Sequence, residues 1–323
     1  MSETLPALSW PLIAEARARI AGKVHVTPVL TSQALDELAG ARLYFKCENL
    51  QKGGAFKARG ASNAVFALSD QAARRGVATH SSGNHAAALA RAAALRGIPA
   101  YIVMPENSAH AKRAAVERYG GRITYCAPTL AAREAAAAEL VRETGALLIH
   151  PYDNLQVMAG AGTAAAEFLE QVPELDVIVC PVGGGGLLSG TAVAAKSLRP
   201  RVRVLGVEPA GADDAARSLR AGHIIPSVDP HTIADGLRSS LGEHPFAEIR
   251  RLVDDIITVE ETDIVAAMRL LWEVLKVIVE PSGAVPYAAL RAPRPPFTGH
   301  SVGVILSGGN LDLDRLPWLA AGP

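Results

Sequence analysis

One lysine is distinguished by the residues around it. Lys57 lies in the stretch GGAFKARGA at residues 53–61, among glycines and small apolar residues. Residues 42–48 are typical of a strand and residues 58–68 of a helix. An amine at such a junction is less solvated than a surface amine, which lowers its pKa and leaves more of it as a free nucleophile. The alternative is a surface lysine that closes a loop, and this stretch alone does not decide between the two.

Four consecutive glycines indicate an anion site. Gly183, Gly184, Gly185 and Gly186 follow an apolar segment and precede a helical pattern that runs to about Leu198. Glycines permit a tight turn, and backbone N–H groups at a helix start attract phosphate. No Gly-Lys-Ser/Thr follows, which excludes a Walker loop, and a dinucleotide fingerprint lacks its third glycine or alanine. A tight turn without a ligand is the alternative.

Two further turns carry polar groups. The stretch THSSGNH at residues 79–85 collects hydroxyls, an amide and imidazoles where backbone N–H groups are free, which suits a carboxylate. Helix capping by Ser82 or Asn84 is the simpler interpretation. The stretch SGGN at residues 307–310 follows the last predicted strand, and ligands of parallel sheets bind at the carboxyl ends of strands.

Short strands and alanine-rich helices must position these segments. Strands are predicted at residues 76–80, 100–104, 122–126, 146–150, 177–181, 203–207, 256–259 and 302–306. Helices are predicted at residues 10–21, 84–96, 109–119, 130–144, 157–171, 262–276 and 282–291. This alternation predicts an α/β protein with open, mostly parallel twisted sheets and helices on both faces. The length of 323 residues allows two domains.

The composition bears on the kind of binding partner and on the cellular compartment. Lys and Arg number 32, as do Asp and Glu, so the balance argues against a nucleic-acid or anionic-membrane partner. Cys47, Cys126 and Cys180 lack disulfide or zinc spacing and are typical of a reducing compartment. No signal-peptide pattern and no run of about 18 apolar residues is present. We therefore expect a soluble, cytoplasmic protein.

The stretches GAFKARGAS, THSSGNH, PVGGGGLLSG and LSGGNLDL together resemble the motifs of the fold-type-II pyridoxal-phosphate enzymes. The most similar branch contains serine/threonine dehydratases, serine racemases and 3-hydroxyaspartate ammonia-lyases. The resemblance runs in order from Thr27 to Leu313 and implies a tryptophan-synthase-β-like fold. It implies a large cofactor-binding domain at residues 1–75 and 152–323, and a small mobile substrate domain at residues 76–151. It also implies a homodimer.

The resemblance assigns roles around pyridoxal 5′-phosphate. Lys57 would bond to the cofactor and then transfer protons, and Phe56 would border the cofactor ring. Asn84 would contact the ring hydroxyl, Gly183 to Gly186 would hold the phosphate, and Ser307 would face the pyridine nitrogen. A neutral serine there does not hold that nitrogen protonated, which favours prompt loss of a β-leaving group over transamination.

The same resemblance assigns the substrate contacts. The residues that would receive the substrate carboxylate are Ser81, Ser82, Asn84, His85 and Ser239. Ser82 also matches the acid/base that racemase-like members place on the face opposite the lysine. Two bases on opposite faces permit racemisation, and one base with a departing hydroxyl permits dehydration, so Ser82 does not decide between them.

Arg133 bears on the choice of substrate. The residues GAFK are more typical of the hydroxyaspartate and racemase-like branch, in which an arginine aligned with Arg133 can reach a second carboxylate. An arginine fork suits a dicarboxylate. A surface arginine paired with a neighbouring glutamate is the alternative. Ala87 stands where a glutamine of a nucleotide effector site is common, so we expect no ATP activation.

An acidic loop resembles the family's divalent-cation site. Glu208 and Asp214 with the Ala212 carbonyl, completed by waters, would give the oxygen ligands that Mg²⁺, Ca²⁺ or Mn²⁺ accepts. The alternative is a solvated acidic helix start, favourable to the helix dipole.

The predicted activity is pyridoxal-phosphate-dependent β-elimination of a 3-hydroxy amino acid to a 2-oxo acid and ammonia. The favoured substrate is 3-hydroxyaspartate, which would yield oxaloacetate, and L-serine or L-threonine is possible. An amino-acid racemase is the alternative enzyme. A non-catalytic binding protein for the cofactor or an amino acid is the alternative of another class, and Lys57, Ser82 and Ser307 argue against it.

Overall fold

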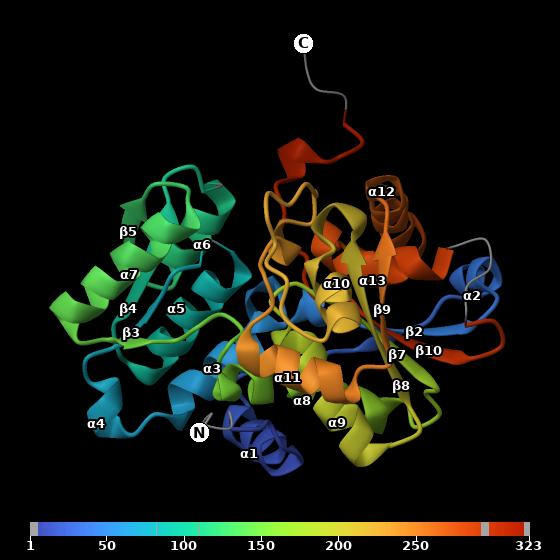
Figure 1. The fold of residues 1–323 in the computed structure, drawn as a ribbon, viewed down its shortest axis with the longest axis horizontal. Helices are drawn as coiled ribbons and strands as arrows, with labels where there is room; N and C mark the ends of the chain where they lie inside the picture. Colours follow the sequence, from blue (N-terminus) through green and yellow to red (C-terminus); the bar gives the residue numbers. More distant parts are fainter. Residues whose placement is uncertain (1–5, 82, 109, 292–296, 320–323) are drawn as a thin grey trace.

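Two sheets organise the chain in the computed structural model, which describes residues 6–81, 83–108, 110–291 and 297–319 (Figure 1). The six-stranded sheet has the order β1-β2-β10-β7-β8-β9, and its strands are β1 (Val29–Leu30), β2 (Arg42–Lys46), β10 (Ser301–Ile305), β7 (Val177–Pro181), β8 (Arg203–Pro209) and β9 (Asp255–Val259). All its neighbours are parallel except β1 and β2. Every residue of β7 and β10 is buried, as expected for strands covered on both faces.

The four-stranded sheet is parallel throughout. Its order is β5-β4-β3-β6, with β5 (Arg122–Cys126), β4 (Ala100–Pro105), β3 (Val77–Thr79) and β6 (Leu147–Leu148). Figure 1 shows this sheet with α5, α6 and α7 on one side of the molecule and the larger sheet on the other.

Helices cover both faces of each sheet. They are α1 (Trp10–Ile20), α2 (Gln33–Ala39), α3 (Lys57–Ala67), α4 (Asp70–Ala73), α5 (Asn84–Arg96), α6 (His110–Arg118), α7 (Leu130–Thr144), α8 (Leu155–Gln171), α9 (Gly186–Leu198), α10 (Asp214–Ala221), α11 (Glu243–Leu252), α12 (Glu261–Leu270) and α13 (Pro281–Ala288). One core cluster packs α2, α12 and α13 on the large sheet, and another packs α8 to α11 on its other face. Alanines of α5 and α7 pack on opposite faces of the small sheet. The predicted fold class is confirmed.

Some element boundaries differ from the sequence prediction. The strand predicted at residues 146–150 is only two residues long, because β6 pairs with β3 alone at the sheet edge. The helix predicted at residues 262–276 ends at Leu270, continues as a π-helical segment (Leu271–Leu275) and stops where Lys276 adopts a φ of 60°. The sequence pattern did not predict β1, α4, α10 or α11. Within the described ranges, no helix has both the length and the apolar composition needed to cross a bilayer.

Candidate active site

Three neighbouring strands of the large sheet lead into the candidate site. The strands β2, β10 and β7 are adjacent, and they are followed by residues 47–57 (the lysine loop), residues 307–310 and residues 183–186 (the glycine loop). The carboxyl ends of parallel strands meet at one edge of a sheet, which is where ligands bind. The topology therefore brings three of the predicted motifs together.

The lysine loop is fastened to the turn after β10. The Phe56 amide donates to the Ser307 carbonyl (3.0 Å), and the Gly309 amide donates to the Gly54 carbonyl (2.9 Å). The Asn310 side-chain amide donates to the Gly53 carbonyl (2.7 Å). These bonds fix the loop just before α3, whose first residue is Lys57.

Lys57 has the environment expected of a reactive amine. Its Nζ donates to the Pro151 carbonyl (2.8 Å) and lies 5.0 Å from the centre of the Phe56 ring. Burial lowers the pKa of Lys57 to about 8, and the nearby Glu280 carboxylate acts in the opposite direction. At neutral pH a larger share of this amine is the free base than for an exposed lysine.

The lowered pKa of Lys57 predicts how the apoprotein reacts with pyridoxal phosphate. The rate should rise with pH and level off above about 8, because the neutral amine is the nucleophile. Glu280→Gln should shift that midpoint modestly to lower pH, since Glu280 has a pKa of about 8 and its partial charge near the midpoint raises the lysine pKa. Stopped-flow absorbance over a pH series measures both profiles. A midpoint near 10 in both proteins would contradict the predicted environment.

The glycine loop is suited to a phosphate. Gly185 precedes α9 with a φ of 88° and offers no capping side chain, so the first-turn N–H groups remain available. A Cβ on Gly184 would overlap the ring of Tyr152, and one on Gly183 would lie 2.9 Å from the Leu237 Cα. Side chains are thus excluded along the loop, and an anion can approach its backbone.

Asn84 is held by two residues that the sequence analysis did not assign. Its Nδ2 donates to Glu280 Oε1 (2.8 Å), and its Oδ1 accepts from Asn310 (2.9 Å). Burial raises the pKa of Glu280 to about 8, with a further increase from Asp235. The local sequence marks Glu280 only as a single glutamate within the apolar run VIVEPSGAV at residues 277–285, and its link to Asn84 is not visible there.

Three histidines and a tyrosine lie in the neighbourhood of Lys57. His150 makes edge-to-face contacts with His80 (5.4 Å between ring centres) and Tyr152 (4.6 Å). Burial lowers the pKa of His80, of His85 and, to about 4, of His150, and the Lys57 charge also lowers the last two. These imidazoles are therefore neutral at pH 7. Of these four residues, only His85 was predicted as a site residue from the sequence.

The structure gives contacts for some of the other residues that were predicted to bind substrate. The Ser81 hydroxyl accepts from the Gly83 amide (3.4 Å). Burial raises the pKa of Tyr152, while a hydrogen bond with Ser239 and the Arg133 charge lower it. Arg133 forms no ion pair with any residue that the structure describes. Ser82 lies outside the described residues.

The Arg133 charge lowers the pKa of His80 and of Tyr152, secondary to the effect of burial on each, and Arg133 is not paired with a neighbouring glutamate among the described residues. Ser307, at the end of β10, is 4% exposed. The structure thus gathers Lys57, Phe56 and Asn84 with the glycine loop and Ser307.

The acidic loop after β8 contains a carboxylate with an unsatisfied oxygen. Glu208 accepts from the Ala215 (3.2 Å) and Ala216 (2.6 Å) amides at the start of α10. Asp214 Oδ2 is buried and has no partner among the described residues. Burial raises the pKa of Glu208 to about 8 and that of Asp214 to about 6. The described part of the chain has no group of three His, Cys, Asp or Glu side chains that could hold a metal, so a cation would also need carbonyl and water ligands.

Comparisons with known proteins agree with this site. Residues 20–308 match the family model described as pyridoxal-phosphate dependent enzyme. A serine racemase of Oryza sativa subsp. indica is 52% identical over 309 residues, covering 94% of this chain and 91% of the relative. A beta-hydroxyaspartate dehydratase of Paracoccus denitrificans is 50% identical over 303 residues, covering 94% and 96%.

A solved structure agrees as well. Maize serine racemase superposes with a TM-score of 0.94 at 50% sequence identity, covering 96% of this chain and 95% of that one. The family resemblance inferred from the four motifs is confirmed. This chain belongs to the fold-type-II family of pyridoxal-phosphate-dependent enzymes.

Proposed function

We propose that this protein is a lyase that converts a 3-hydroxy amino acid to a 2-oxo acid and ammonia, with 3-hydroxyaspartate as its favoured substrate. The observation that carries the proposal is Lys57, an amine of lowered pKa that donates to the carbonyl of Pro151, the residue before the Tyr152 that packs against the glycine loop. The similarity to a beta-hydroxyaspartate dehydratase supports the substrate class. The loss of one water and the hydrolysis of the resulting enamine balance the reaction.

The residues fit the cofactor, because the glycine loop excludes side chains and Ser307 and Asn84 lie at the strand ends. Pyridoxal phosphate, when bound, withdraws electrons from the substrate Cα. We propose that Lys57 removes the Cα proton, and that Ser82 is the acid/base for the face of the substrate opposite the lysine. Phe56 borders the ring, and Ser81, Asn84, His85 and Ser239 receive the substrate carboxylate. A neutral Ser307 favours departure of the β-hydroxyl over transamination.

A product assay tests the activity against the racemase alternative, which the rice serine racemase at 52% identity favours. The protein with added cofactor is incubated with L-serine, L-threonine and each 3-hydroxyaspartate isomer. Oxo acid is measured by coupled dehydrogenases and D-amino acid by chiral chromatography. Oxaloacetate from one hydroxyaspartate isomer is the expected result. D-serine without any oxo acid would make the racemase the correct assignment.

Arg133 should control the preference for a second carboxylate. Arg133→Gln should lower kcat/KM for 3-hydroxyaspartate by about 30- to 160-fold, because a charge-assisted hydrogen bond contributes about 2–3 kcal/mol. The value for L-serine should change less than about threefold, since serine lacks that group. Arg142→Gln on the same helix is the matched control, as Arg142 pairs with Glu139 at the surface. An equal loss for both substrates would rule out a dicarboxylate contact.

We also propose that Glu208, the Ala212 carbonyl and Asp214 bind Mg²⁺ or a similar divalent cation. Mg²⁺ at about 100 times its Kd should stabilise the fold by about 2.7 kcal/mol and raise the Tm by about 4 °C. Asp214→Asn should abolish this shift, whereas Asp213→Asn should retain it, because Asp213 already pairs with Arg217. Differential scanning fluorimetry with and without EDTA measures it. A Tm indifferent to Mg²⁺ would refute the site.

We further propose that residues 76–151 form a small domain that moves against the rest of the chain. The whole four-stranded sheet lies in this segment, and Lys112 of α6 pairs with Asp235 of the remainder. Opening would break that pair, so resonance energy transfer between fluorescent dyes on the two parts should change when substrate binds.

We also propose that the protein is a homodimer and that it is cytoplasmic. The free, buried cysteines suit a reducing compartment. Light scattering measures the molar mass and so tests the homodimer.

A further inference from the structure

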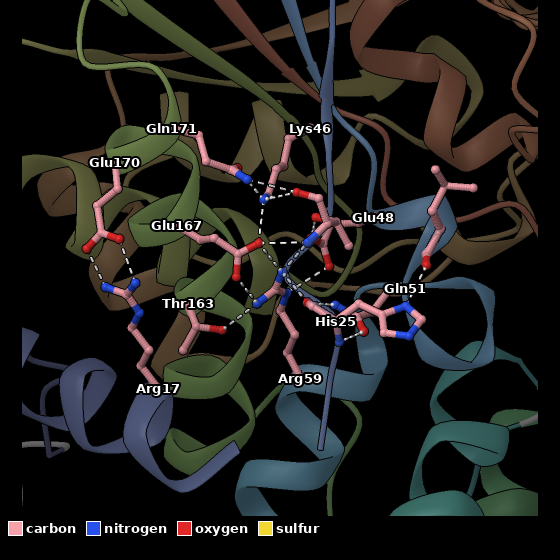
Figure 2. Close-up of polar contacts among 12 residues, drawn as sticks. Arg17, His25, Lys46, Glu48, Gln51, Arg59, Thr163, Glu167, Glu170 and Gln171 are labelled. Atoms are coloured by element: carbon pink, nitrogen blue, oxygen red, sulfur yellow. Dashed lines mark hydrogen bonds and ion pairs between the residues drawn. The ribbon is translucent and has the colours of Figure 1, made fainter. Parts of the chain in front are cut away.

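Four charged side chains are buried behind the lysine loop (Figure 2). They are Lys46, Glu48, Arg59 and Glu167, called here the charge cluster, and their residues are 0%, 0%, 1% and 7% exposed. Two positive and two negative groups balance one another. Buried ion pairs add little to stability compared with apolar side chains of similar volume, so their presence calls for another explanation.

Arg59 is the centre of the cluster. Its Nε and Nη2 donate to the two oxygens of Glu48 (both 2.8 Å), and its Nη1 and Nη2 donate to those of Glu167 (3.1 and 3.0 Å). Figure 2 shows the guanidinium between the two carboxylates. Remaining contacts go to Thr163 and the His25 carbonyl (both 3.4 Å). The planar fork thus fixes the direction of the arginine on both sides.

The Glu48–Arg59 pair closes the lysine loop on itself. The two residues are 11 positions apart, with Glu48 near the start of the loop and Arg59 two positions after Lys57. Between them lie Gly53 and Gly54, which adopt φ values of 69° and 73°, and glycine itself restricts the backbone less than any other residue. A bidentate pair across such a segment restricts where α3 can begin.

The rest of the cluster attaches this closed loop to the scaffold. Glu167 lies on α8 and accepts from Arg59, from Lys46 of β2 and from the Thr27 amide. Thr27 also donates its hydroxyl to Glu48 (2.6 Å). Both carboxylates therefore have several donors, and the pair is held against a strand and a helix of the large sheet.

We propose that Glu48 and Arg59 are positioning residues that act as a clasp, setting the place of Lys57 for bond formation with the cofactor. The inference rests on the role proposed for Lys57. Since an ion pair of fixed geometry specifies one arrangement of the loop, the clasp contributes to the geometry of the site beyond its contribution to stability. A purely structural role predicts instead that stability and cofactor attachment change together.

Two variants separate the effect of charge balance on stability from the effect of the Glu48–Arg59 pair on cofactor attachment. Glu48→Gln alone leaves the cluster with an unbalanced positive charge and should lower the Tm of the apoprotein. The double variant Lys46→Met/Glu48→Gln restores the balance, and should regain most of that Tm. The neutral amide at residue 48 still cannot accept both N–H groups of Arg59. The Kd of the double variant for pyridoxal phosphate should therefore stay at least about tenfold above that of the unaltered protein.

Attachment is measured by absorbance titration and by borohydride trapping followed by peptide mapping, which need no turnover. Glu170→Gln is the matched control, because Glu170 lies on α8 with Glu167 but in an exposed pair with Arg17 (Figure 2). This substitution should change neither the Tm nor the attachment of the cofactor. Glu48→Asp keeps the charge and shortens the reach, so it decides the question if the double variant does not fold. It should weaken attachment with little change in Tm.

Recovery of the Tm without recovery of attachment supports the clasp. Recovery of both together, or unchanged attachment in Glu48→Asp, overturns it. If the unaltered protein holds no cofactor at Lys57, the proposed function fails and the clasp fails with it. That outcome is distinguishable, because a failed clasp leaves attachment in the unaltered protein intact.

Discussion

Replacement of Lys57 by alanine is expected to lower the rate of 2-oxo acid release by at least about 1000-fold. The loss combines the covalent attachment of the cofactor with removal of the Cα proton, both of which need this amine. The fold should remain, because within the described residues the lysine side chain makes one hydrogen bond, to the Pro151 carbonyl, and one contact with the Phe56 ring. Steady-state kinetics with circular dichroism measure the two effects separately.

Lys52→Ala is the matched control for this substitution. Lys52 lies in the same loop, five positions earlier, and its side chain makes no ion pair within the described residues. It should retain activity within about twofold. An active Lys57→Ala protein, or a Lys52→Ala protein that loses activity to the same degree, would contradict the assignment of the reactive amine.

Gly185→Ala is expected to have the second largest effect, on both stability and cofactor binding. The residue adopts a φ of 88°, and a Cβ there would lie 2.8 Å from side-chain atoms of both Leu241 and Pro245. Left-handed strain of about 1–2 kcal/mol adds to overpacking of about 1–3 kcal/mol. Urea unfolding should therefore show a loss of about 2–5 kcal/mol. The Kd for pyridoxal phosphate should rise at least tenfold, by about 1.4 kcal/mol.

Gly97→Ala separates strain from crowding. Gly97 ends α5 with a φ of 71°, yet a Cβ there meets nothing within 4 Å. This variant should lose only the strain contribution and should bind the cofactor normally. Equal losses in both variants would mean that the glycine loop is not packed as described.

Local sequence pattern was sufficient for much of the fold. The segments that became α5, β5, α7 and β7 have the predicted boundaries, because apolar periodicity and glycine stops act over a few neighbouring residues. The order of the strands in the two sheets was not predictable from such patterns. The same holds for β6, whose length depends on a partner strand 70 residues away (Leu147 with Val77).

The candidate site divides in a similar way. Lys57 and the glycine loop were identified because lysine and glycine have distinctive local chemistry. Glu280 was not, because its significance depends on Asn84, 196 positions away. Arg59 appeared in a quoted motif without a role, since its two carboxylate partners are 11 and 108 positions distant. Long-range polar pairs of this kind leave no periodic signature.

The most direct test of the central claim is to trap the cofactor and locate it. The protein with bound pyridoxal phosphate is reduced with borohydride, digested and mapped by mass spectrometry. We expect one pyridoxyl group per chain, on Lys57, and none in Lys57→Ala. A modification on another lysine such as Lys46 or Lys112, or retained labelling in the variant, would contradict the account.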